Sequence, residues 1–363
     1  MREEEPARTS AAPPSEEQVA AACLLTRMDR RRAFAAIAAS GSAVAALTGP
    51  VEKAARRHHE YQPDELLELC ERHGLAVLTY FDHAFPPALR HIPDPPLVLY
   101  LRGERECLVE QTVAVVGARR CSRMGAELAQ SLGAGLAGGG LTVVSGLARG
   151  IDAAAHRGAL TAAGSMGSTA AVMGAGLASI YPRANTQLAE AMVEAGGVLV
   201  SEYPPTMAPA RHQFPERNRL ISGLSKGVVV VEAGERSGSL ITARLALEQG
   251  REVMAVPGAI GPGLSRGCHR LLRDGAALVE SVADVFVTLG YIMQPGADDG
   301  LEPRTVPASL GAVLAAIEPV LTTVDELVAS TGLAPADVAV KLLELELAGF
   351  VQQVAEGYIR RPF

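Results

Sequence analysis

Short apolar runs recur through the middle of the chain, and stretches with helical periodicity separate most of them. The runs cover residues 112–116, 142–145, 170–173, 198–201, 228–233 and 253–256. Because they are nearly continuous in Val and Ala, they predict strands that are buried on both faces. Such strands form a parallel sheet covered by helices. We therefore expect a Rossmann-like, doubly wound α/β domain with a mostly parallel sheet, which we place at residues 76–290.

The segments before this block have a different pattern. Residues 1–17 are acidic and rich in Ala, Pro and Ser, which is typical of a disordered tail. Residues 18–75 have helical periodicity broken by glycine and proline, and they predict a small helical domain like the SAM or helix-hairpin-helix domains. A proline-rich approach then leads to a short predicted strand at residues 97–101.

The carboxyl-terminal part of the chain predicts a separate small domain. Residues 291–308 are polar and rich in Pro and Gly, as expected of a linker. In residues 309–363, Thr323 and Glu326 have the spacing of a capping box that opens a helix. A further helix from Pro335 through Leu347, followed by a hairpin turning at Glu356 and Gly357, completes the pattern of a winged-helix-like domain.

Composition narrows the class of protein. No apolar run reaches the roughly 18–20 residues that span a bilayer, and the first residues lack an apolar signal core, so we expect a cytoplasmic protein without membrane association. The five cysteines are scattered and predict neither disulfides nor a metal site. The net charge is −7, yet residues 112–280 carry more Lys and Arg than Asp and Glu, which is compatible with a nucleic-acid partner.

Glycines and polar residues follow the predicted strands, where open parallel sheets bind ligands. Glycine lets backbone N–H groups approach an anion, and helix N-termini add favourable partial charge. Any single turn of this kind could be no more than a tight strand-to-helix connection. As a set, with arginines between them, the turns predict an anion-binding edge. The residues concerned are Gly117, Arg119, Ser145, Gly146, Arg149, Gly150, Ser237, Gly238 and Ser239.

One further cluster stands before the fifth predicted strand of this block. Phe214, Arg217, Asn218 and Arg219 combine an aromatic ring with two arginines and an amide. Such a group can hold phosphates and stack on an unpaired base. The alternative interpretation is a helix N-terminus with solvated arginines.

Six stretches of this sequence together resemble the DprA/Smf family of DNA-processing proteins. The similarity covers about residues 80–284, with the family's order kept. The stretches are VAVVGARR, SGLARGIDAAAHRGAL, AVMGAGLASIYPRAN, FPERNRLISGLS, VVVVEAGERSGSLITARLALEQGREVMAVPG and GCHRLLRDGA. The resemblance implies a homodimeric recombination mediator that binds and protects incoming single-stranded DNA and helps to load the RecA recombinase during natural transformation.

The resemblance also implies roles for residues. Arg119 would contact phosphate, Phe214 would stack on a base, and the same pocket would be lined by Arg149, Arg217, Asn218 and Arg219. Two positions depart from the family pattern. Ser168 stands where the family often has lysine, which removes one possible phosphate contact, and His269 stands where it usually has asparagine.

An enzyme is the main alternative. Nucleotide-cleaving Rossmann proteins of the lysine-decarboxylase-like type need a carboxylate just after the glycine-rich turn, and residues 237–247 contain none. Glu232 and Glu235 precede that turn. Asp152 and His156 could form an acid/base pair, although a helix cap with a surface contact is the simpler interpretation. No lysine follows a Walker-type loop. We therefore expect no catalytic residues, no metal ligands and no cofactor.

A nucleotide cofactor is also suggested, misleadingly, by a G-x-G-x-x-G pattern at residues 133–138. This pattern falls at the end of a predicted helix, the reverse of the context that binds dinucleotides. A transcription factor reading DNA through the winged helix is a third possibility. The candidate recognition helix carries Asp337, Glu344 and Glu346 against Lys341 alone, which disfavours contact with a polyanion. We expect a protein-interaction or dimer-supporting role for this domain.

Overall fold

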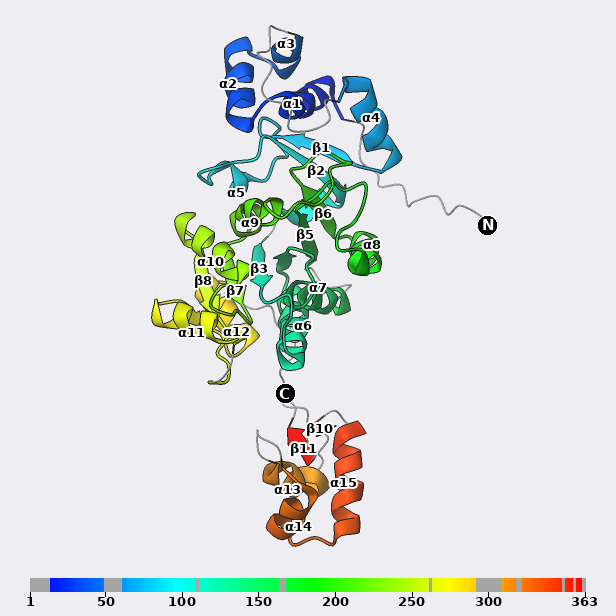
Figure 1. The fold of residues 1–363 in the computed structure, drawn as a ribbon, viewed down its shortest axis with the longest axis vertical. Helices are drawn as coiled ribbons and strands as arrows, with labels where there is room; N and C mark the ends of the chain where they lie inside the picture. Colours follow the sequence, from blue (N-terminus) through cyan, green and yellow to red (C-terminus); the bar gives the residue numbers. More distant parts are fainter. Residues whose placement is uncertain are drawn as a thin grey trace, which may run out of the picture. The chain divides into compact units, whose positions relative to one another are not determined.

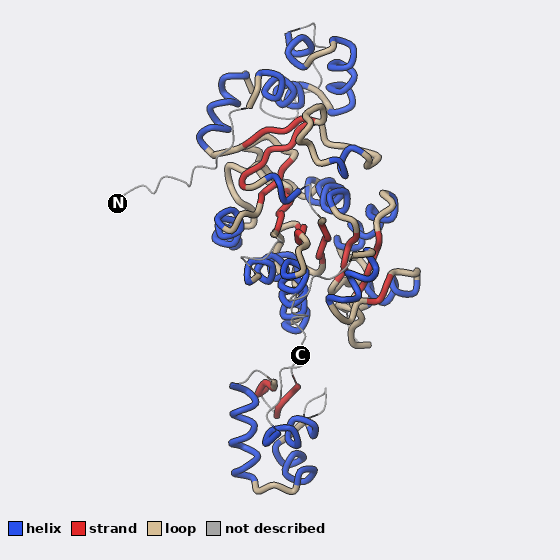
Figure 2. The backbone as a smooth tube through the Cα atoms, turned by 180° about the vertical axis from the view of Figure 1, so that it is seen from behind, coloured by secondary structure: helices blue, strands red, loops and turns tan. Residues whose placement is uncertain are grey.

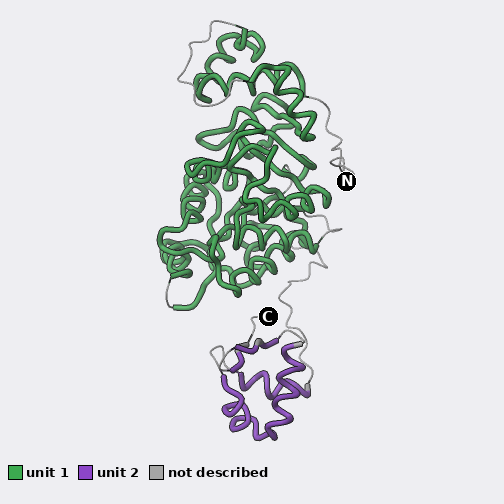
Figure 3. The backbone as a smooth tube through the Cα atoms, turned by 45° about the vertical axis from the view of Figure 1, so that its right-hand side comes forward, with its two compact units in different colours: residues 1–298 green, residues 299–363 purple. Residues whose placement is uncertain are grey.

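The computed structural model describes residues 14–48, 61–108, 111–162, 168–260, 263–291, 308–317, 322–347, 350–354 and 357–360. The chain divides into two compact units, Met1–Asp298 and Asp299–Phe363 (Figure 3). Most of the predicted tail, residues 1–13, lies outside the described residues, as do residues 292–307 of the predicted linker.

The first unit is built on one nine-stranded sheet (Figures 1 and 2). Its strand order is β1-β2-β6-β5-β4-β3-β7-β8-β9. The seven strands from β6 to β9 are parallel, whereas β1 and β2 extend the β6 edge in antiparallel pairing. The strands are β1 (Ala76–Thr79), β2 (Val98–Gly103), β3 (Thr112–Val116), β4 (Thr142–Ser145), β5 (Thr169–Met173), β6 (Val198–Ser201), β7 (Gly227–Val230), β8 (Glu252–Ala255) and β9 (Ala277–Leu278).

The expected fold class, a doubly wound α/β domain with a mostly parallel sheet, is confirmed. The six apolar runs of the central block are β3 to β8, and the short strand expected at residues 97–101 is β2. Alternate residues of the longer strands enter different cores, because successive side chains point to opposite faces. In β3, Val113 and Val115 enter one core, while Ala114 and Val116 enter the other.

Helices cover both faces of the sheet (Figure 2). One face packs against α6 (Arg123–Gly138), α7 (Ile151–Thr161) and α12 (Val282–Leu289). The other face packs against α5 (Pro87–Arg90), α9 (Gln213–Leu224), α10 (Gly238–Glu248) and α11 (Arg266–Arg273). Two short 3-10 helices, η1 (Arg105–Leu108) and η2 (Arg183–Asn185), and helix α8 (Thr186–Glu194) complete the connections.

The dinucleotide-like glycine pattern lies inside helix α6, as its position after a helical stretch predicts. A Cβ built on Gly133 would come within 2.2 Å of the Ala155 carbonyl oxygen in α7. This glycine therefore allows two helices to pack closely, which accounts for it without a nucleotide.

The first helices form a small layer on the β1–β2 side of the sheet (Figure 1). They are α1 (Glu16–Arg27), α2 (Arg30–Ser40), α3 (Ala43–Thr48) and α4 (Pro63–Arg72). Their apolar residues share one core with Tyr100 of β2 and Leu199 of β6. Ion pairs add to this contact, because Arg30 at the start of α2 reaches both Asp94 and Glu202.

The second unit has the expected winged-helix fold. It consists of α13 (Ala308–Ala316), α14 (Val324–Thr331) and α15 (Pro335–Leu347) with the hairpin β10 (Val351–Val354) and β11 (Gly357–Arg360). The capping box of Thr323 and Glu326 is formed as predicted. Glu356 of the predicted turn lies outside the described residues. Within the described part of the chain, no helix is long and apolar enough to cross a membrane.

Candidate functional site

The strand order places a crevice between the carboxyl ends of β3 and β7. From β3 the chain adds β4, β5 and β6 on one side, and α9 then carries it back across to β7 on the other side of β3. This reversal is a topological switch point, where open α/β sheets bind their ligands. A pocket of about 670 Å³ lies at this position.

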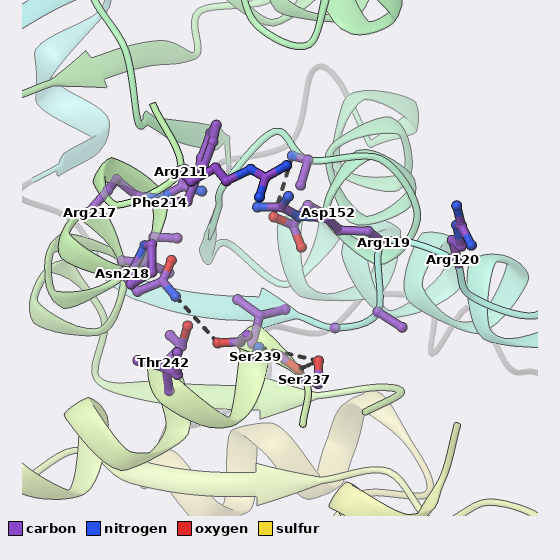
Figure 4. Close-up of a pocket in the computed structure, with 18 of the residues that line it drawn as sticks. Arg119, Arg120, Asp152, Arg211, Phe214, Arg217, Asn218, Ser237, Ser239 and Thr242 are labelled. Atoms are coloured by element: carbon purple, nitrogen blue, oxygen red, sulfur yellow. Dashed lines mark hydrogen bonds between the residues drawn. The ribbon is translucent and has the colours of Figure 1, made fainter. Parts of the chain in front are cut away.

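Three segments line most of this switch-point pocket (Figure 4). They are the turn after β3, the first turns of α9 and the start of α10. The structure thus brings together these predicted site residues: Gly117, Arg119, Phe214, Arg217, Asn218, Ser237, Gly238 and Ser239. Sequence reasoning missed further lining residues, among them Arg120, Ala148, Tyr181, Arg211 and Thr242.

Aromatic and cationic groups meet at one wall of the pocket. The guanidinium carbon of Arg119 lies 5.0 Å from the centre of the Phe214 ring. The centres of the Tyr181 and Phe214 rings are 5.7 Å apart, and the two ring planes make an angle of 35°. Arg119, Arg120 and Arg211 are exposed, and none of them forms an ion pair among the described residues. Their charges therefore remain available to an anionic ligand, and that of Arg119 lies beside a ring that can stack on a planar group.

The start of α10 forms another wall. Ser237 is the N-cap of this helix, and its hydroxyl oxygen accepts a hydrogen bond from the Ser239 amide at 3.4 Å. The two serine hydroxyls are 2.7 Å apart, and the Asn218 amide donates to the Gly238 carbonyl oxygen at 3.4 Å. A helix N-terminus carries partial positive charge, so this wall also favours an anion.

Arg217 forms the floor of the pocket rather than a solvated clamp. Only 4% of its surface is exposed. Its Nη1 donates to the Gly146 carbonyl oxygen at 2.9 Å and also to the carbonyl oxygen of Val172. Burial lowers the pKa of Arg217 to about 10, with the charge of Asp152 opposing the shift, so the guanidinium stays protonated at neutral pH. Arg217 therefore adds positive electrostatic potential to the pocket, while its hydrogen-bond donors contact backbone carbonyl groups.

Arg219 does not line the pocket, contrary to what the family resemblance implies. It is 8% exposed and contacts Glu202, and its Nε lies 3.3 Å from an Asp94 oxygen. The physical reason is helix geometry, because a residue two positions after Arg217 points to nearly the opposite side of α9. The alternative of two solvated arginines is also wrong, since both side chains are buried.

The turn after β4 contacts several of the residues that line the pocket. Ser145 donates its hydroxyl to the Val115 carbonyl oxygen at 2.6 Å, and Gly146 leaves room for Arg217 and Asp152, which a Cβ would meet at 2.5 and 2.7 Å. Gly150, with φ of +81°, packs on the backbone of Arg119. None of Ser145, Gly146, Gly150 or the exposed Arg149 lines the pocket itself.

Asp152 and His156 are both buried, so the expected surface contact is wrong. An Asp152 oxygen accepts hydrogen bonds from the amides of Gly146 at 3.2 Å and Ala148 at 3.4 Å, while burial raises the pKa of its carboxyl. His156 Nδ1 lies 2.7 Å from the Thr169 hydroxyl, and burial lowers the pKa of the imidazole to about 3. Asp152 thus braces the turn that Arg217 also holds.

Glu232, the other carboxylate considered for catalysis, is engaged at the start of α6. Its oxygens accept hydrogen bonds from the amide and the hydroxyl of Ser122, the N-cap residue of that helix. Among the described residues there is no group of three or more His, Cys, Asp and Glu side chains that could hold a metal ion.

The family described as DNA recombination-mediator protein A matches residues 76–290, and the DprA winged helix domain matches residues 299–357. Protein Smf of Escherichia coli is 43% identical over 282 residues, covering 76% of this chain and 75% of Smf. DNA processing protein DprA of Streptococcus pneumoniae is 42% identical over 248 residues, covering 68% of this chain and 86% of that protein.

Two solved structures are similar in fold and sequence. The X-ray structure of DprA from Streptococcus pneumoniae superposes with a TM-score of 0.55 at 45% identity, covering 59% of this chain and 74% of that one. DNA processing protein A from Helicobacter pylori, studied for its mode of binding single-stranded DNA, gives a TM-score of 0.54 at 29% identity. That match covers 60% of this chain and 97% of the Helicobacter protein.

Proposed function

Because the chain belongs to the DprA/Smf family of DNA-processing proteins, the family of DNA recombination-mediator protein A, we propose that it binds single-stranded DNA in the switch-point pocket. The observation that carries the proposal is the wall where the exposed arginines, Arg119 foremost, lie beside Phe214 and Tyr181. The single-stranded DNA binding studied in the Helicobacter relative supports the same ligand.

The chemistry of the pocket favours a single strand over a duplex. In a duplex the bases are stacked on each other, so their faces are not available to Phe214 and Tyr181. A single strand can turn a base onto these rings while Arg119, Arg211 and the N-terminus of α10 hold its phosphates. We expect this binding to be independent of base sequence, because every base has a face that can stack.

Fluorescence anisotropy with labelled single-stranded and blunt duplex oligonucleotides, across a series of salt concentrations, tests this function. We expect tighter binding of the single strand and a linear fall of log affinity with log salt, because bound counterions are released. Equal or tighter binding of the duplex would contradict the proposal.

In the same proposal, the protein acts as a homodimer in the cytoplasm, protects incoming single strands and helps to load RecA during natural transformation. Membership of a recombination-mediator family supports this role. A direct test follows RecA-dependent ATP hydrolysis on single-stranded DNA coated with single-strand-binding protein. Addition of this protein should shorten the lag, and an unchanged lag would count against RecA loading. Sedimentation velocity separates dimer from monomer.

We also propose that the pocket binds DNA without chemical turnover. The carboxylates near it have structural partners, since Asp152 accepts two backbone amides and Glu232 caps α6. A general base needs free access to a substrate proton, which neither carboxylate has in these arrangements.

A further inference from the structure

The two aromatic rings of the switch-point pocket are carried by connecting segments. Phe214 lies in the first turn of α9, directly after residues 202–212, which connect β6 to that helix. Tyr181 lies in residues 174–182, which connect β5 to η2. Neither segment forms a helix or strand of its own. The position of each ring therefore depends on what its segment packs against.

The two segments are hydrogen-bonded to each other. The Gly176 amide donates to the Met207 carbonyl oxygen at 2.9 Å. The Ala178 amide donates to the Pro205 carbonyl oxygen, also at 2.9 Å. A Cβ built on Gly176 would come within 2.2 Å of the Pro205 carbonyl oxygen, so glycine allows this close approach. The segments thus form one unit, and a displacement of either one also displaces the ring on the other.

The layer of first helices, α1 to α4, contacts residues 202–212 at two points. Arg30 Nη1, at the start of α2, lies 2.7 Å from an oxygen of Glu202, whose side chain is 14% exposed. The hydroxyl of Tyr61, just before α4, is hydrogen-bonded to the Thr206 hydroxyl, and Tyr61 is buried. Polar contacts that are shielded from water in this way are stronger than those on an open surface. They restrain the segment that leads to Phe214.

The same layer packs against the other segment through apolar side chains. Leu177 and Ile180 are buried in the core that also contains Leu24 of α1. Ile180 directly precedes Tyr181, and the Tyr61 ring belongs to this core as well. The layer thus reaches both segments that carry a ring, although none of its described residues lines the pocket.

Two carboxylates link the layer to the helix that carries Phe214. One oxygen of Glu202 contacts Arg30 of the layer, and the other contacts Arg219 of α9. Asp94 forms a second bridge of the same kind, because its two oxygens contact the same two arginines. Arg219, which does not line the pocket, therefore connects the pocket helix to the layer.

We propose that the layer of first helices positions the two stacking rings of the pocket and thereby sets its affinity for single strands. Arg30 and Tyr61 are positioning residues in this arrangement, because they act through residues 202–212 and do not touch the DNA. This inference rests on the proposed function of the pocket. Rings that are already held in place bind a base more tightly, because less conformational entropy is lost when the strand binds.

The test uses variants that each remove one contact between the layer and the segment. Tyr61→Phe keeps the ring in its core and removes only the hydroxyl, and Arg30→Met removes the charge at the start of α2. Arg32→Met is the matched control, because Arg32 lies on the same helix and pairs with Asp29 of its own layer. Each protein is titrated, across a salt series, with an oligothymidine that carries 2-aminopurine at intervals. The fluorescence of this base falls when it stacks on a ring.

We expect Tyr61→Phe and Arg30→Met to weaken binding about threefold to tenfold, because the loosened segment must become ordered when the strand binds. At saturation the 2-aminopurine should be less quenched than in the parent complex. The slope of log affinity against log salt should stay unchanged, since no phosphate contact is lost. Arg32→Met should match the parent in all three measurements.

A further pair of variants separates positioning from a general loss of stability. Thr206→Val removes the other hydroxyl of the hydrogen bond that Tyr61→Phe breaks. The double variant should therefore bind about as weakly as each single variant, and no more weakly, because all three lose the same contact. Circular dichroism checks that every variant is folded.

Parent-like affinity and quenching in both Tyr61→Phe and Arg30→Met would overturn the inference. So would losses from Tyr61→Phe and Thr206→Val that multiply in the double variant, because the two hydroxyls would then act separately. A lower salt slope in Arg30→Met would make this arginine a phosphate contact rather than a positioning residue. Failure of the parent to bind the strand or to quench its fluorescence would instead remove the proposed function of the pocket, and the inference with it.

Discussion

Arg217 of α9 donates a hydrogen bond to the carbonyl oxygen of Gly146, 2.9 Å away, and so a buried positive charge holds the turn that follows β4. Asp152 holds the same turn from its amide side through Gly146 and Ala148. Gly146 is therefore held at its carbonyl group by Arg217 and at its amide group by Asp152. These two buried side chains therefore fix the shape of the pocket.

Replacing Arg217 should lower the stability of the fold more than replacing any other residue that lines the pocket. Arg217→Ala leaves Asp152 as a buried charge without its neighbour and removes a hydrogen-bond donor from two carbonyl groups, which should lower the free energy of unfolding by about 3–5 kcal/mol. Urea denaturation measures the loss. A variant that unfolds like the parent but no longer binds DNA would instead show that Arg217 contacts phosphate directly.

Arg119 should behave in the opposite way. Its side chain is exposed, so Arg119→Ala should change the free energy of unfolding by no more than about 0.5 kcal/mol. It should weaken single-strand binding and reduce the salt slope by about 0.7, the share of one phosphate contact. Arg244→Ala, at an exposed site of α10 paired with Glu248, is the matched control and should bind normally. Parent-like binding by Arg119→Ala would remove this residue from the site.

The buried imidazole of His156 should make the protein sensitive to acid. Its pKa is about 3 in the folded state and about 6.5 when unfolded, so the unfolded chain binds the extra proton between these values. Stability from this group is complete above pH 6.5 and is lost as pH falls toward 3. At pH 4.5 the loss should reach about 2–3 kcal/mol.

The variant His156→Asn provides the comparison for this effect. It keeps a polar group near the Thr169 hydroxyl but has no proton to gain. The difference in free energy of unfolding between parent and variant, measured from pH 7 to pH 4.5, should therefore shrink as the pH falls. A difference that stays constant over this range would mean that His156 titrates normally in the folded protein.

The winged-helix unit should contribute little to single-strand affinity. Its helix α15 exposes Asp337 and Glu344, and its one lysine, Lys341, donates to the Ser309 carbonyl oxygen. A chain ending after Gly290 keeps every residue that lines the pocket, so its affinity for single strands should remain within about threefold of the parent. Circular dichroism checks that the shortened chain is folded. Near-complete loss of binding by a folded truncation would locate the DNA site in the removed unit.

The protein should neither hydrolyse ATP nor release bases from nucleoside monophosphates. Glu232→Gln should lower stability by about 1 kcal/mol, because an uncharged amide is a weaker partner for the N-terminus of α6. Chromatography of nucleotides after long incubation gives the activity measurement. Turnover that the parent shows and Glu232→Gln or Asp152→Asn lacks would identify an enzyme.

Much of the architecture follows from residue patterns because buried parallel strands leave a strong signal. The six Val- and Ala-rich runs locate β3 to β8, and the residues just after these strands locate most of the pocket. By contrast, β9 consists only of Ala277 and Leu278, which is too short for any periodicity to show. Strand β1, Ala76–Thr79, follows a helix so closely that its pattern merges with it.

Side-chain directions are harder to predict from a sequence than buried strands are. The run of Arg217, Asn218 and Arg219 gives the composition of a phosphate clamp, but the face that each residue takes depends on how α9 is rotated against the sheet. Asp152 and His156 are polar, yet each has a specific partner that makes burial tolerable. Tyr181 and Arg211 reach the pocket from connecting segments, where spacing in sequence carries no information about direction.

The pairing of β2 with β6 also bears on how the protein is made. Tyr100 is in register with Ser201, so β2 leaves the ribosome about 100 residues before the strand that completes its hydrogen bonds. At ordinary translation rates the nascent β2 waits on the order of 5–20 seconds with one edge open. An open, apolar strand edge invites pairing with other chains. We therefore expect chaperones to bind the nascent chain during this interval, and to bind the folded protein, in which β6 covers this edge, much less.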